Sequence, residues 1–250
     1  MKIVFSTKNV ARSSFLELCR YAYDYGYCGF EIYDAIEERS SHADSILRRD
    51  KTSDAKRKLL NRSLSVSALR YPHPIECEAV TSEQLSKYVD MAANAGIEHI
   101  IIRVESEMQY EAIRAKLSRA IERAESSDVS ILLETVGYLA DTEHVIELIN
   151  ALSSACIGVC WNVRATYFGE GETAETTIKT LGAYIKYVRL GDMKDGETVL
   201  IGEGDLPVEG LLLALSSLNY EGYICCAWNE QIADADIVLT HFAKIGRAHV

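Results

Sequence analysis

Residues 157–192, IGVCWNVRATYFGEGETAETTIKTLGAYIKYVRLGD, carry the pattern that decides the fold. Apolar, β-branched and aromatic side chains fill 157–163 and 185–190, which is typical of strands buried on both faces of a parallel sheet. A helical pattern lies between these two runs. The stretch therefore predicts a strand, a helix and a second strand parallel to the first.

The same alternation recurs along the whole chain. Further strand-like runs lie at 2–6, 29–33, 64–69, 99–104, 129–134 and 222–228. Helical stripes separate them, and several end in a glycine turn just before the next run, as in YGYCGFEI and NAGIEHII. Eight strands alternating with helices in a chain of 250 residues predict one α/β domain, a single (β/α)₈ barrel over residues 1–244.

A doubly wound open sheet is the alternative fold. That fold usually has a glycine-rich turn after its first strand, and the stretch STKNVARSS after the first run lacks the GxGxxG pattern. The longest connection, 34–61, is expected to be a solvated excursion with one helix. The last six residues, IGRAHV, continue no pattern and resemble translated sequencing-adapter DNA. We therefore expect 245–250 to be a non-native tail and the natural protein to continue past 244, with a possible fused domain downstream.

Composition and charge limit the possible partners. The chain is 48% hydrophobic and has a formal net charge of −11, which argues against general nucleic-acid binding. The N-terminus has no signal-peptide pattern, and no apolar run is long enough to span a bilayer. The expected location is the cytoplasm, without membrane partners. The seven cysteines lack zinc-site spacing and are expected to be small core residues.

In a barrel of this kind, chemistry gathers at the C-terminal ends of the strands. Four arginines lie at such ends: Arg70, Arg103, Arg164 and Arg189. They predict a cationic mouth that suits a small phosphate or carboxylate ligand. In the alternative interpretation these arginines pair internally with acidic neighbours and bind nothing. Those neighbours are Glu31, Glu105, Glu134 and Asp192.

The second half of the chain resembles the xylose isomerase-like TIM barrels, the sugar phosphate isomerase/epimerase group. The stretches that carry the resemblance are ILLETVG, IGVCWNVRATYFGEGETAE, YIKYVRLGDMKDG, VLIGEGDLP and NYEGYICCAWNEQ, spread over roughly 129–231. FEIYDA at the second strand also fits. The resemblance implies the barrel fold and an isomerase or epimerase that acts on a small sugar or sugar phosphate.

The resemblance also implies a divalent metal, manganese or magnesium, held by four side chains. These are a glutamate, an aspartate, a histidine and a glutamate on strands five to eight. Here Glu134 retains the first position, whereas Asn162, Arg189 and Ala227 replace the other three. We therefore expect no metal cofactor, although the family uses one.

The hypothesis that follows is that Arg189 projects toward the vacated metal position and neutralises Glu134, with Asp192 assisting. These three are the predicted catalytic residues. The predicted substrate-binding residues are Arg164, Asn162, Arg103, Glu105, Arg70, His73 and Trp228. Three functions remain open: a sugar isomerase or epimerase, which the family resemblance favours, a non-catalytic barrel or accessory domain that binds an anionic metabolite, and a structural or assembly domain. A homo-oligomer is an alternative to the fused downstream domain.

Overall fold

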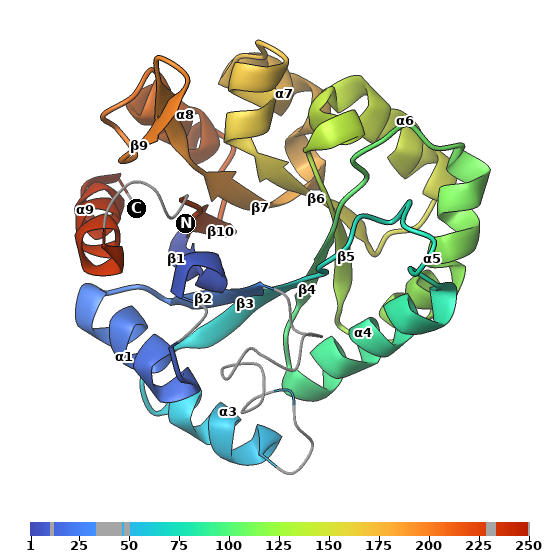
Figure 1. The fold of residues 1–250 in the computed structure, drawn as a ribbon, viewed down its shortest axis with the longest axis horizontal. Helices are drawn as coiled ribbons and strands as arrows, with labels where there is room; N and C mark the ends of the chain where they lie inside the picture. Colours follow the sequence, from blue (N-terminus) through green and yellow to red (C-terminus); the bar gives the residue numbers. More distant parts are fainter. Residues whose placement is uncertain (11–12, 34–46, 48–50, 229–233, 250) are drawn as a thin grey trace.

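The computed structural model describes residues 1–10, 13–33, 47, 51–228 and 234–249 (Figure 1). Most of the long connection predicted at 34–61 lies outside these residues, as do the strand-end residues Asp34 and Asn229. The helix expected in that connection is described, as α3 (Thr52–Leu60).

Eight parallel strands close into a barrel and confirm the predicted (β/α)₈ fold. In order around the barrel they are β1 (Lys2–Ser6), β10 (Tyr223–Cys226), β7 (Ile185–Leu190), β6 (Ile157–Asn162), β5 (Ser130–Glu134), β4 (His99–Ile102), β3 (Ser65–Arg70) and β2 (Gly29–Tyr33). Each of these eight barrel strands coincides with one of the eight apolar runs identified in the sequence. The open doubly wound sheet is thereby excluded.

Helices form a ring outside the strands (Figure 1). Besides α3 they are α1 (Phe15–Tyr25), α4 (Ser82–Ala95), α5 (Tyr110–Glu125), α6 (Thr142–Leu152), α7 (Ala174–Leu181), α8 (Val208–Ser217) and α9 (Ala235–His249). Gly26 and Gly96 end α1 and α4 in the left-handed conformation, as the glycine turns predicted. The helix α9 includes 245–249, and the expectation that 245–250 are non-native stays a prediction.

Side chains that point into the barrel form an apolar cluster and, above it, a set of polar side chains at the mouth. The apolar cluster is buried below the mouth and consists of Val4, Ala68, Ile101, Leu132, Cys160, Tyr187, Tyr223 and Cys225. Because side chains two residues apart share a strand face, the next inward positions lie at the mouth. They include Arg70, Glu134, Asn162 and Arg189. The mouth therefore has a closed apolar base beneath its polar side chains.

A short hairpin follows β7 that the sequence did not predict. Its strands, β8 (Asp192–Lys194) and β9 (Glu197–Val199), pair antiparallel and are too short to leave an apolar run. All seven cysteines are free, but only four are buried: Cys19, Cys160, Cys225 and Cys226. The other three are partly buried, so the prediction of core cysteines holds only in part. Among the described residues, no helix combines the length and the apolarity that crossing a membrane requires.

Candidate functional site

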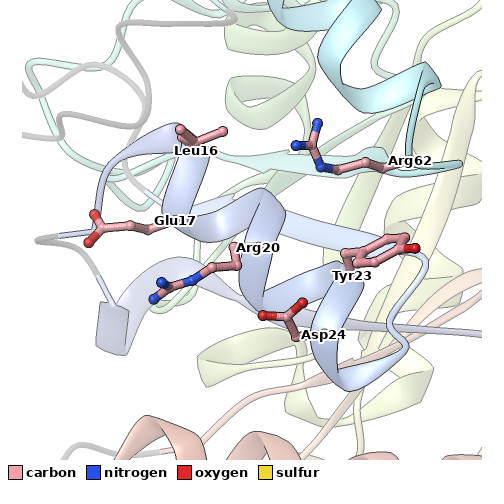
Figure 2. Close-up of a pocket in the computed structure, with 6 residues that line it drawn as sticks. All are labelled: Leu16, Glu17, Arg20, Tyr23, Asp24 and Arg62. Carbon is pink, nitrogen blue, oxygen red and sulfur yellow. The ribbon is translucent and has the colours of Figure 1, made fainter.

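The barrel mouth encloses a cavity of about 300 Å³. It is lined by Lys8, Tyr33, Arg70, Glu134, Val136, Asn162, Arg164, Arg189, Gly191, Ala227 and Trp228. A larger hollow, about 410 Å³, lies on the outer surface, where side chains of α1 and Arg62 line it (Figure 2). The mouth is the better candidate site, because buried charged side chains converge there, whereas outer-face residues such as Leu16 and Tyr23 are exposed.

Arg189 meets Glu31 in the barrel interior. Its Nη1 donates to both carboxylate oxygens of Glu31, which is completely buried. Ser6 Oγ donates a further hydrogen bond to Glu31 Oε1 at 2.9 Å. Glu31 thus has a guanidinium, a hydroxyl and the Cys225 thiol as partners, which is the kind of compensation that a buried carboxylate requires.

Glu134 is held by three side chains from different strands. Arg70 places Nε and Nη2 each 2.8 Å from Glu134 Oε2. Asn162 Nδ2 donates to the other oxygen, Oε1, at 2.9 Å. Arg189 Nε lies 3.3 Å from Oε1, as an ion pair without a hydrogen bond. The predicted contact between Arg189 and Glu134 is therefore present, but Glu31 is the main partner of Arg189 and Arg70 is the main partner of Glu134.

We call Glu31, Arg70, Glu134 and Arg189 the buried quartet; their formal charges cancel. Burial alone would raise the pKa of Glu134, but Arg70 and Arg189 outweigh it and lower that pKa to about 2. Burial likewise opposes the charged form of Arg189. The two glutamates outweigh that effect and hold the pKa of the guanidinium well above its usual value. At neutral pH Glu134 is a carboxylate held by two guanidinium groups and the Asn162 amide.

These residues do not fit the divalent metal of the family. Both oxygens of Glu134 already bind side-chain N–H groups, and Ala227 offers no ligand atom. The guanidinium groups of Arg70 and Arg189 would repel a cation at close range. Within the described residues, no group of three or more histidine, cysteine, aspartate or glutamate side chains is arranged to hold a metal ion.

Of the other predicted binding residues, two line the cavity and three do not. Arg164 and Trp228 line the cavity, and Arg164 is exposed, with Nε 3.1 Å from Met193 Sδ. Arg103 and Glu105 pair with each other after β4 and are not among the lining residues. His73 is exposed on the loop after β3, where it packs against the edge of a tyrosine ring rather than on the cavity.

Asp192 has a different role from the one expected. It is fully buried, and its carboxylate accepts four backbone hydrogen bonds of 2.8–3.1 Å. The donors are the N–H groups of Met193, Gly202, Gly204 and Leu206. With both oxygens used in this way, Asp192 fixes the loop between β9 and α8. The structure gives it no contact with Arg189 and no place in the cavity lining, which corrects the expectation that it assists Arg189.

We expect Asp192→Asn to lower the free energy of unfolding by about 2 kcal/mol. The amide replaces one acceptor by an NH₂ group, which faces backbone N–H donors and leaves some of them unsatisfied. Urea unfolding measures this loss. Asp195→Asn is the matched control, because Asp195 is exposed at the turn of the hairpin. An unchanged urea midpoint for Asp192→Asn would contradict the proposed loop-fixing role.

Sequence reasoning named Glu31 among the possible internal partners but did not single it out for Arg189, and it missed Lys8 and Tyr33 in the cavity wall. All three lie at the ends of the first two strands, so their position was available as a signal. The Arg70 guanidinium lies 4.7 Å from the centre of the Tyr33 ring, and Lys8 Nζ lies 5.6 Å from it. Tyr33 thus gives both cations an aromatic face.

Comparison with solved structures shows the same fold throughout. The probable 3-DHS dehydratase AsbF, involved in petrobactin synthesis, from Bacillus anthracis has a TM-score of 0.80 and 12% identity, with 99% of each chain covered. The 3-keto-D-glucoside 4-epimerase YcjR from E. coli has a TM-score of 0.77 and 16% identity, also with 99% of each chain covered. D-Allulose 3-epimerase from Methylomonas sp. has a TM-score of 0.75 and 14% identity, covering 100% of this chain and 97% of that one.

A comparison with curated protein sequences finds no match. At 12–16% identity the solved structures establish the fold and nothing finer. The family comparison is more specific, because residues 19–244 match the family described as "Xylose isomerase-like TIM barrel". The match covers nine-tenths of the chain and every barrel strand after β1. This chain belongs to the xylose isomerase-like TIM barrel family.

Proposed function

We propose that this protein binds a small sugar-like or anionic metabolite at the barrel mouth without a divalent metal. The observation that carries the proposal is the buried quartet: Arg70 and Arg189 fill the centre of the mouth and neutralise both carboxylates. Above them, a cavity of about 300 Å³ has room for roughly ten water-sized groups. This is the size of a five- or six-carbon metabolite.

Binding is favoured over turnover by the state of the carboxylates. A general base works best with a pKa near the working pH, whereas the pKa of Glu134 is lowered to about 2 by its arginine partners. A two-base proton transfer would also need a second carboxylate, and Ala227 stands at that position of the family pattern.

Sugar isomerisation or epimerisation is the second candidate function. Membership of the xylose isomerase-like family favours it, and two of the similar structures carry the names of sugar epimerases. In that case Arg189 would stabilise the oxyanion of an enediolate in place of a metal.

The test is calorimetric titration of the chelator-treated protein with sugars, sugar phosphates and small carboxylates, with and without manganese. We expect binding that chelation leaves unchanged. Ala227→Phe should abolish it by filling the cavity, while Ala183→Phe, an exposed position at the other end of the barrel, should not. Tight stoichiometric manganese binding would overturn the proposal. Deuterium uptake from D₂O into a bound sugar, followed by NMR, would replace it with the isomerase function.

A further inference from the structure

Within the part of the chain that the structure describes, two cations at the mouth have no acidic partner once the buried quartet has been accounted for. Lys8 and Arg164 line the cavity and are exposed. Their contacts with other described residues are with neutral groups: Lys8 lies over the Tyr33 ring, and Arg164 donates to Met193 Sδ. Among the residues that the structure describes, neither has a carboxylate partner. Counted over the described residues alone, the cavity lining and Glu31 therefore have a surplus of two positive charges, although the chain as a whole carries −11.

These cations approach the cavity from different parts of the rim. Lys8 follows β1 and Arg164 follows β6, and the strands β10 and β7 lie between them in the barrel. Low-dielectric walls focus the field of such charges into the space they enclose. A ligand in this space experiences two positive groups that no side chain of the described mouth neutralises.

The base of the cavity contains an unpaired hydrogen-bond donor. Arg70 is only 5% exposed, and its Nη1 has no hydrogen-bond partner. Its other two nitrogens are used by Glu134. A buried guanidinium N–H without an acceptor is rare and unfavourable, so the Arg70 side chain that lines the cavity keeps one unpaired donor.

Resting on the proposed function, we propose that the ligand is a small dianion, held by Lys8 and Arg164 above the buried quartet. Two charges of the ligand match the two uncompensated charges of the rim. The chemistry fits a dicarboxylate, whose charges are separated, and a phosphate monoester, whose charges share one group. Both are small polar molecules that a cavity of this volume accepts.

The experiment is a calorimetric titration with four small probes at low ionic strength and again at 0.15 M salt. Succinate and glycerol 3-phosphate are the dianions, butyrate is the monoanion and erythritol is neutral. We expect both dianions to bind at least tenfold more tightly than butyrate, and added salt to weaken them most. The preferred dianion distinguishes the two sources of charge: tighter succinate binding indicates separated carboxylates, and tighter glycerol 3-phosphate binding indicates a single phosphate.

Lys8→Gln and Arg164→Gln should each weaken dianion binding about fivefold to tenfold and leave the melting temperature unchanged, because both side chains are exposed. Lys87→Gln and Arg119→Gln remove matched exposed cations from the outer helices and should change nothing. Erythritol or butyrate binding as tightly as the dianions would overturn the dianion inference and leave the proposed function standing. Full dianion affinity in both mouth variants would have the same effect. Failure of all four probes to bind would overturn both.

Discussion

Replacing Arg189 with methionine is expected to lower the free energy of unfolding by about 3–5 kcal/mol. Methionine keeps most of the side-chain length but removes the cation that Glu31 and Glu134 share. Glu31 would then remain completely buried, with the Ser6 hydroxyl and the Cys225 thiol as its partners among the described residues. An uncompensated buried carboxylate is among the most destabilising changes that a single substitution produces. Urea unfolding at neutral pH, followed by circular dichroism, measures the loss.

Two controls separate lost charge pairing from lost packing. The double variant Arg189→Met with Glu31→Gln removes the buried negative charge as well, and should recover a large part of the stability. Arg164→Met deletes an exposed guanidinium at the same mouth and should change stability by less than about 0.5 kcal/mol. A loss below about 1 kcal/mol for Arg189→Met, or no recovery in the double variant, would show that the Arg189–Glu31 pair is not an important buried contact.

The fold could be predicted because the strands of a parallel barrel have a distinct sequence pattern. Each strand is buried on both faces, so its apolar run stands out from the amphipathic helices on either side. The predicted runs agree with the strands to within a residue or two, as in 157–163 for β6 (Ile157–Asn162). The hairpin of β8 and β9 was missed for the same physical reason. Its strands lie outside the barrel and are not buried on two faces.

For the site, the sequence predicted which residues lie at the mouth but not which of them pair with each other. Alternation along strands places Arg189, Glu134 and Asn162 together at the mouth, and the structure brings these three together. The choice of partners depends on reach across the barrel interior, which no local pattern encodes. Glu31 lies on β2, three strands around the barrel from β7, yet a long arginine side chain spans that distance. Internal pairing accounts for three of the four strand-end arginines, and Arg164 is the exception.

The buried quartet should also make the protein sensitive to acid in a defined range of pH. The pKa of Glu134 is lowered to about 2 in the folded protein, whereas an unfolded glutamate has a pKa of about 4.3. Below about pH 4.3 the unfolded chain therefore takes up this proton before the folded chain does. The corresponding stability, about 3 kcal/mol, is fully present above that range and is lost as the pH falls toward 2.

Glu134→Gln tests this linkage, because glutamine keeps the shape and cannot titrate. The variant should be less stable than the wild type at pH 7, where it leaves Arg70 and Arg189 with one carboxylate between them. The difference between the two proteins should shrink as the pH falls from about 4.5 to 2.5, because the wild type loses the charge that the variant never had. Glu83→Gln is the control: Lys87 and Arg119 lower the pKa of Glu83, but its exposure lets solvent screen the interaction. A difference between wild type and Glu134→Gln that stays constant over this range would mean that Glu134 is not held as a carboxylate by its arginines.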